Sequence, residues 1–266
     1  MPSIRVEGRN ILLGFLYDDD KNWHKPGSDA PDGNFAIFRS TELEFEVLSD
    51  ILATRTIWYY HDDEVFIAST SQRAIIMFLE SFEFNERVIP WILSTGTPGP
   101  DYSWDRRIKK LPPDASVHLD KKTWSVSKTV HPFKFNVQNK TYQEHQKELY
   151  DVMAASVKAL NKLDLHHWPI TLSGGDDSRA ILYLLKKYAV GKKPLRTLTH
   201  GTKKSSYDKK IDAYIADQLA KHENTDHSFY STDLPNEPIQ KVLDRFFYAS
   251  QGRIDHITGY LDGMKM

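Results

Sequence analysis

The sequence predicts an α/β protein with two domains, an α+β first half with antiparallel sheets and a second half with a parallel sheet. Short β-branched and aromatic runs dominate the chain up to about residue 130. Amphipathic helical patterns alternate with strand-like runs after that point. The length of 266 residues also suits one large domain or two small ones. We therefore expect residues 1–135 and 136–266 to form separate domains.

The first half contains apolar runs of strand length, separated by turn residues. Residues 72–81 instead carry apolar side chains at helical spacing and predict a helix. Residues 98–113 have the composition of a loop. The segments expected to form strands are 10–17, 35–38, 42–48, 56–60 and 65–68, followed by a hairpin over 116–128.

The second half alternates helical and strand patterns. Residues 141–163 carry an apolar stripe with charges opposite, which predicts an amphipathic helix. A strand at 168–172, a helix at 179–188 and a strand at 195–200 form a βαβ pattern, and a helix at 210–221 follows. This alternation favours a doubly wound parallel sheet.

Composition excludes several classes of function. Lys plus Arg is 35 and Asp plus Glu is 36, and a formal net charge of -1 argues against a dedicated nucleic-acid binder. The chain has no cysteine, which excludes disulfides, thiolate metal sites and a cysteine nucleophile. No apolar run approaches the length of a membrane span, and the N-terminus lacks the apolar core of a signal peptide. We therefore expect a cytoplasmic protein without nucleic-acid or membrane partners.

The segment TLSGGDDSR, residues 171–179, is the most informative about chemistry because it lies between a predicted strand and a predicted helix. Its two glycines let backbone N–H groups approach an anion, and the helix adds free N–H groups and the positive end of its dipole. Ser173 and Ser178 add hydroxyl donors, and Asp177 can hold magnesium or cap the helix. The segment lacks the lysine of a Walker A loop and the third glycine of a Rossmann fingerprint. It fits a phosphate or pyrophosphate, and a plain turn with a good N-cap is the alternative.

Within this segment, LSGGDDS resembles the S-G-G-x-D-S pyrophosphate loop (PP-loop) of the N-type ATP pyrophosphatases. The leading Leu and the trailing Arg-Ala-Ile look most like the asparagine synthetase family. Downstream, Asp212-x3-Ala216-x3-Ala220 followed by His227 resembles a segment after that family's second strand. In the first half, residues 32–36 (DGNFA), 50–60, 66–69 (FIAS) and 107–115 (RIKKLPPDA) resemble segments of the family's glutaminase domain.

The resemblance implies an Ntn-hydrolase-like first half and a second half like the adenine nucleotide alpha hydrolases. Such enzymes bind ATP and Mg²⁺ and activate a carboxylate, usually aspartate, as an acyl-adenylate. An amine or ammonia then attacks, and AMP and pyrophosphate are released. A homodimer is compatible with the family, and the resemblance assigns no catalytic residue. The residues implied to bind ATP and pyrophosphate, with Asp177 also meeting magnesium through the pyrophosphate, are Leu172, Ser173, Gly174, Gly175, Asp177, Ser178 and His200.

Two departures from the family pattern change the expected activity. The family's glutaminases use a cysteine directly after Met1, where this chain has Pro2, so we expect no glutamine hydrolysis. A later family segment, S-G-x-G-x-D-E-x-x-x-G-Y, has a partial counterpart in Ser250–Tyr260 that lacks the second glycine and the D-E pair. This counterpart is either degenerate, or the real segment lies beyond Met266 and the chain is incomplete.

Two other functions are alternatives to the ligase. One is a catalytically incomplete nucleotide-binding or interaction protein that keeps the fold. The other is sulfur or tRNA-modifying chemistry, which the lack of cysteine and of a basic patch disfavours.

Overall fold

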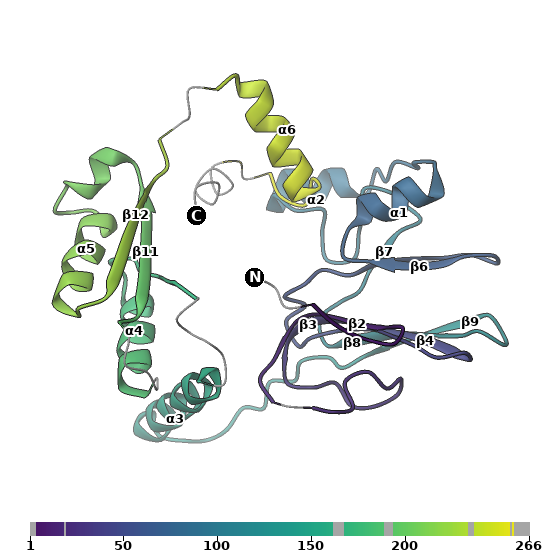
Figure 1. The fold of residues 1–266 in the computed structure, drawn as a ribbon, viewed down its shortest axis with the longest axis horizontal. Coiled ribbons are helices and arrows are strands. Elements are labelled where there is room, and N and C mark those ends of the chain that lie inside the picture. Colours follow the sequence, from purple (N-terminus) through teal and green to yellow (C-terminus); the bar gives the residue numbers. More distant parts are fainter. Residues whose placement is uncertain are drawn as a thin grey trace. The chain divides into compact units, whose positions relative to one another are not determined.

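The computed structural model describes residues 4–18, 20–161, 168–188, 194–233, 237–255 and 257. They form a mixed α/β protein with two antiparallel sheets and one parallel sheet (Figure 1). The chain divides into two compact units. The N-terminal unit comprises Met1–Phe135 and Gln240–His256, and the C-terminal unit comprises Asn136–Ile239 and Ile257–Met266. The sequence assigned residues 240–256 to the second domain, whereas the structure groups them with the first.

The N-terminal unit contains a six-stranded antiparallel sheet of order β1-β2-β3-β4-β8-β9 and a three-stranded antiparallel sheet of order β6-β5-β7. The strands of the larger sheet are β1 (Ile4–Glu7), β2 (Asn10–Leu16), β3 (Gly33–Ser40), β4 (Glu44–Ser49), β8 (Ala115–Asp120) and β9 (Ser125–Val130). Those of the smaller sheet are β5 (Trp58–His61), β6 (Phe66–Ser69) and β7 (Lys109–Lys110).

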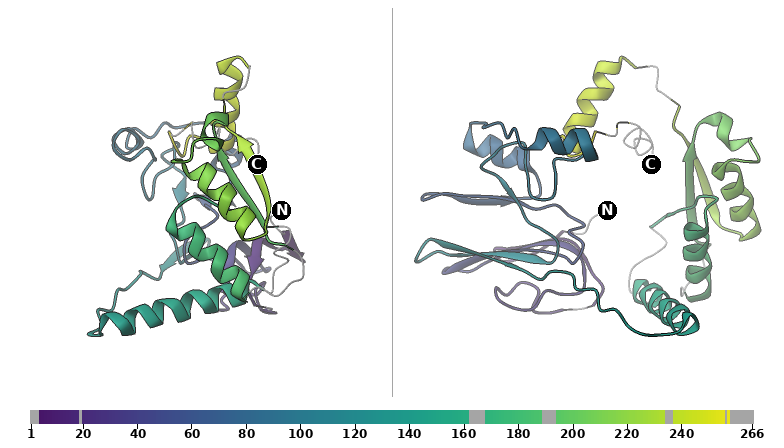
Figure 2. Two further views of the ribbon diagram at one scale, coloured as in Figure 1. Left: turned by 90° about the vertical axis from the view of Figure 1, so that its left-hand side faces the viewer. Right: turned by 180° about the vertical axis from the view of Figure 1, so that it is seen from behind.

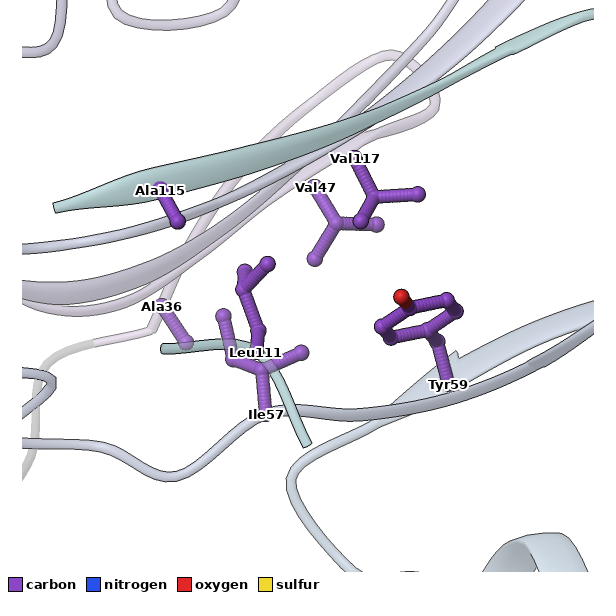
Figure 3. Packing of buried hydrophobic residues seen from close by; sticks show 7 residues of the cluster. All are labelled: Ala36, Val47, Ile57, Tyr59, Leu111, Ala115 and Val117. Atoms are coloured by element: carbon purple, nitrogen blue, oxygen red, sulfur yellow. The ribbon is translucent and has the colours of Figure 1, made fainter. Parts of the chain in front are cut away.

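The two antiparallel sheets pack face to face around one apolar cluster. Because side chains alternate between the faces of a strand, every second residue of β8 is buried. Figure 3 shows the larger sheet's side chains on one side of the cluster and those of β5 and its neighbours on the other. The buried members of this cluster are Ala36, Val47, Ile57, Tyr59, Leu111, Ala115 and Val117.

Three helices belong to the N-terminal unit, namely α1 (Gln72–Leu79), α2 (Val88–Thr95) and α6 (Ile239–Ser250). Helix α1 starts at Ser71, whose hydroxyl accepts the Ala74 N–H. Its Ile75 packs against Trp58 and Ile108, so α1 covers the outer face of the smaller sheet (Figures 1 and 2). The sequence predicted α1 but neither α2 nor α6.

The C-terminal unit is built on a parallel sheet of order β10-β11-β12. The elements of the C-terminal unit are α3 (Tyr142–Leu160), β10 (Ile170–Thr171), α4 (Asp176–Tyr188), β11 (Arg196–Gly201), a short 3-10 helix (Lys203–Ser206), α5 (Asp212–His222) and β12 (Asp226–Ser231). Helix α3 begins with a capping box, in which Thr141 and Glu144 exchange hydrogen bonds.

Helices α4 and α5 share one face of this parallel sheet. Leu182 of α4 and Ala216 and Ala220 of α5 belong to the same buried cluster as Leu172. Successive crossovers of the same hand along β10, β11 and β12 place both helices on the same side. The parallel sheet is therefore as expected, but the described residues do not show the second helical layer of a doubly wound sheet.

None of the helices in the described part of the chain combines the length and apolar character needed to cross a membrane.

Candidate functional site

The 172–175 loop connects β10 to α4 at the carboxyl edge of the parallel sheet. Leu172 is buried, and its N–H donates to the Leu198 carbonyl over 2.7 Å. The Leu172 carbonyl accepts the Thr199 hydroxyl. These two bonds extend the pairing with β11, so the loop leaves the sheet from a fixed position. That edge is where parallel sheets bind ligands.

The two loop serines bond to each other and to the loop backbone. The Ser178 hydroxyl lies 2.9 Å from the Ser173 hydroxyl and accepts the Ser173 N–H over 3.1 Å. The Ser173 hydroxyl also accepts the Gly175 N–H over 3.2 Å. The sequence predicts that both hydroxyls are donors to a ligand. In the structure, their hydrogen bonds are within the loop and fix its shape.

Gly174 is required by the close approach of helix α5. A Cβ on this residue would lie 2.9 Å from the Asp212 Oδ1 atom and 3.0 Å from the Asp212 Cα atom. By contrast, a Cβ on Gly175 would meet only the Ser173 hydroxyl, at 3.3 Å. The glycine loop and the Asp212 segment, which the sequence analysis singled out separately, therefore meet in the structure.

Several N–H groups at the start of α4 have no acceptor. Within the described part of the chain, the N–H groups of Gly174, Asp176 and Asp177 make no hydrogen bond. The positive end of the α4 dipole lies at the same place. Arg179 adds a cation near the loop, where its guanidinium donates to the Gly175 carbonyl and pairs with Asp176. The loop therefore suits an anionic group such as a phosphate.

His200 lies at the same edge of the sheet as the loop. The parallel register pairs Thr171 with Leu198. Ser173 and His200 each lie two residues further along, so both follow the paired residues at the same edge. Its side chain is exposed. His227 lies elsewhere, because it pairs with Thr197 near the start of β11.

His227 and the alanines of α5 have packing roles. Ala216 and Ala220 are 0% and 1% exposed, which lets α5 approach the sheet closely. The Nδ1 atom of His227 is 2.9 Å from the Thr197 hydroxyl. Burial lowers the pKa of His227, although Asp217 acts in the opposite direction. Burial therefore favours the neutral form of the imidazole.

Carboxylates at the loop do not form a metal site by themselves. Asp177 is exposed at the start of α4, and Asp212 lies beside Gly174. Among the described residues, no group of three or more His, Cys, Asp or Glu side chains is arranged to hold a metal ion. A magnesium ion here would need oxygen ligands from a bound phosphate, as is usual for Mg²⁺.

The segment after α6 makes its contacts within the N-terminal unit. The carbonyls of Gln251 and Gly252 accept hydrogen bonds from Gln72 and Trp104, both over 2.8 Å. The beginning of the proposed counterpart Ser250–Tyr260 is therefore part of the N-terminal unit. His256 and residues 258–260 lie outside the described residues, as does Pro2.

Residues 148–251 match the sequence model of the asparagine synthase family. This segment is similar to asparagine synthases. The match covers α3 from residue 148 onward, the loop, Asp212 and α6. No curated protein matches the chain.

Among solved structures, one match is the glutamine phosphoribosylpyrophosphate (PRPP) amidotransferase from B. subtilis complexed with ADP and GMP. It is 9% identical, with a TM-score of 0.27, and the match covers 92% of this chain and 52% of that chain. The chain thus spans about half the length of that structure. A TM-score of this size does not establish a common fold.

Two residues at the loop were absent from the predicted site. Arg179 directly follows Ser178. Its position in the first turn of α4 is a local signal from which the sequence could have placed it in the predicted site. Asp212 was recognised as part of a motif, but its contact with Gly174 is long-range in sequence and needs the packing of α5 to be seen.

Proposed function

We infer that the C-terminal unit binds MgATP at residues 172–178, which comprise the 172–175 loop and the start of α4 and are called the 172–178 loop below. We infer that it activates a carboxylate by adenylation, as an asparagine-synthase-like ligase. The observation that supports this most is the set of open N–H groups of Gly174, Asp176 and Asp177 in a segment similar to asparagine synthases. Backbone donors at a helix N-terminus bind phosphate oxygens, and here they would hold the pyrophosphate part of ATP.

In the proposed reaction, a carboxylate oxygen attacks the α-phosphorus and the bond to the pyrophosphate oxygen breaks. An amine or ammonia then attacks the acyl carbon, and AMP leaves with the electron pair of the cleaved acyl–oxygen bond. The loop N–H groups and the α4 dipole stabilise the charge that develops on the departing pyrophosphate. Asp177 would hold magnesium through the phosphates, and the carbonyl of Leu172 and the His200 region would face the adenosine. Aspartate is the carboxylate we propose first.

The remaining parts of the proposal concern the N-terminal unit, the source of the amine, and the location and substrates of the enzyme. Its two antiparallel sheets are proposed to be an Ntn-hydrolase-like scaffold without glutaminase activity, because no cysteine is present. The amine would then come from free ammonia or another small molecule. We propose a cytoplasmic enzyme that acts on small molecules.

The test is the release of pyrophosphate from MgATP in the presence of aspartate and ammonium. Asp177→Asn should lower this rate strongly, whereas Asp176→Asn should leave it close to wild type, because the Asp176 side chain is 94% exposed and pairs with Arg179. Isothermal titration with MgATP measures binding separately. ATP binding without pyrophosphate from any carboxylate tried would favour the non-catalytic alternative. Equal effects of both variants would contradict the role given to Asp177.

A further inference from the structure

The N-terminal unit contains a cavity of about 470 Å³, which is distinct from the 172–178 loop. Its walls come from β5, helix α2 and the loop after it, β7, and the segment after α6, all of which belong to this one unit. Small-molecule sites have volumes of about 300–1,000 Å³. The cavity is therefore large enough for a ligand of metabolite size.

Aromatic side chains form the apolar part of the wall. Trp58 is 2% exposed, and its indole N–H is buried without an acceptor among the described residues. Trp91 lies on α2 with its ring against Gly99, where a Cβ would come within 2.9 Å of the ring. Tyr102 also lines the cavity. Flat aromatic walls favour a ligand with a ring of its own.

Two cations, Lys110 and Arg253, line the same cavity and form no ion pair with a carboxylate among the residues that the structure describes. Arg253 donates to the Thr56 hydroxyl and to the Ser250 carbonyl, each over 3.1 Å, and makes no salt bridge with a described carboxylate. The Lys110 ammonium makes no hydrogen bond or salt bridge to the residues that the structure describes. Two like charges in a partly buried space disfavour each other unless an anion lies between them.

The electrostatic setting of Lys110 agrees with this geometry. Burial lowers the pKa of Lys110, the Asp101 carboxylate raises it, and the Arg253 guanidinium lowers it. Asp101 is exposed and acts on Lys110 electrostatically, without a salt bridge between the two in the described part of the chain. A bound anion would compensate both cations in a way that Asp101 does not.

We propose that this cavity is a binding site for a small aromatic anion, with the ring beside Trp91 and Tyr102 and a carboxylate or phosphate group at Lys110 and Arg253. Charge-assisted hydrogen bonds from both side chains hold the anionic group, and stacking on tryptophan holds the ring. The site does not rest on the function proposed for the C-terminal unit, because none of its residues lies in that unit.

The test uses ¹⁹F NMR titration of the full chain with three probes, 4-fluorophenylacetate, 4-fluorophenyl phosphate and the neutral 4-fluorophenylacetamide. At least one anion should bind about tenfold more tightly than the amide, which corresponds to the loss of one charge-assisted interaction. The anion that binds more tightly identifies the headgroup as carboxylate or phosphate. No anion binding at millimolar concentrations, or equal affinity for the amide, would overturn the proposal.

Variants locate the binding within the unit. Lys110→Gln and Arg253→Gln should each weaken the anion about tenfold and leave the amide unchanged. Lys109→Gln is the matched control, since Lys109 precedes Lys110 in β7, is exposed and does not line the cavity. Ser178→Ala in the C-terminal unit should also leave the probe affinity unchanged. If both cavity variants bound the anion as wild type does, the cation pair would not be the site.

Discussion

The Arg39 guanidinium of the N-terminal unit lies among four acceptors, whereas the N–H groups that begin α4 in the C-terminal unit have none among the described residues. Arg39 is fully buried and donates to the carbonyls of Trp23, Ser28 and Asp29 and to the Glu46 carboxylate. These bonds tie the loop between β2 and β3 to the larger sheet.

The difference separates polar groups that build the fold from polar groups that remain open to a ligand. A buried polar group without a partner is costly, and Arg39 avoids this cost because its donors are satisfied within the N-terminal unit. Asp50 shows the same pattern, because its carboxylate accepts the N–H groups of Phe35, Leu52 and Thr54. Asp176 and Asp177, whose N–H groups are open, are exposed residues, so the lack of a partner costs little there until an anion binds.

The largest effect is expected for Arg39→Met. This change leaves the Glu46 carboxylate buried with the Gly27 N–H as its remaining donor. Breaking a buried pair in this way should lower the free energy of unfolding by about 3–5 kcal/mol, measured by urea denaturation. The control Arg9→Met removes an exposed pair with Glu42, whose side chains are 66% and 82% exposed, and should change it by less than about 1 kcal/mol. Similar values for the two variants would contradict the structural role of Arg39.

A second effect tests the open loop. Gly174→Ala places a Cβ 2.9 Å from Asp212 Oδ1 and 3.0 Å from Asp212 Cα, so the loop or α5 must move. We expect MgATP affinity to fall about hundredfold, or 2.7 kcal/mol, with a small change in stability. Gly175→Ala meets only the Ser173 hydroxyl at 3.3 Å and should have a smaller effect. Isothermal titration compares the two. Equal losses would show that the approach of α5 is not what requires Gly174.

How much of this arrangement the sequence predicts depends on how local each contact is. Strands with alternating apolar side chains, such as Ala115–Asp120, were predicted, as was the strand–loop–helix at residues 171–179. The strand Asp226–Ser231 was missed because its side chains are mostly polar and none is buried. The motif also predicted the glycines of the loop and the acidic residues in the first turn of α4.

Contacts between distant segments could not be predicted. Helix α6 buries Val242 and Phe246, so its pattern fits a helix, but the pattern does not name the surface that receives it. The structure places α6 with α1, where Arg73 lies 3.7 Å from the centre of the Tyr248 ring. The mutual bonding of Ser173 and Ser178 likewise depends on the path of the loop, which spacing alone does not determine.

Lowering the pH should reduce the stability of the two units over different pH ranges, and the C-terminal unit should respond at the higher pH. Burial lowers the pKa of His227, so the folded state keeps it neutral while the unfolded chain takes up a proton below about pH 6.5. Its contribution to stability is therefore present above about pH 6.5 and is lost as the pH falls through the lower folded pKa. Urea denaturation of wild type and His227→Gln, from pH 7.5 to 5, should show a weaker pH dependence in the variant. An NMR titration that gives His227 an ordinary or raised pKa would contradict this.

The smallest effect near neutral pH is expected in the N-terminal unit, at Asp105. Burial would raise its pKa, but hydrogen bonds from the Arg107 side chain and from the N–H groups of Glu83 and Arg107 hold it below the usual value. The stabilisation is complete above the unfolded pKa of about 3.9 and is lost only as the pH falls through the lower folded value. Asp105→Asn should therefore flatten the loss of stability between about pH 4 and pH 2, measured by urea denaturation, while Asp63→Asn, at an exposed turn, should not. Because this window lies below that of His227, the C-terminal unit should lose stability first. The reverse order would mean that acid sensitivity in this chain does not follow His227 and Asp105.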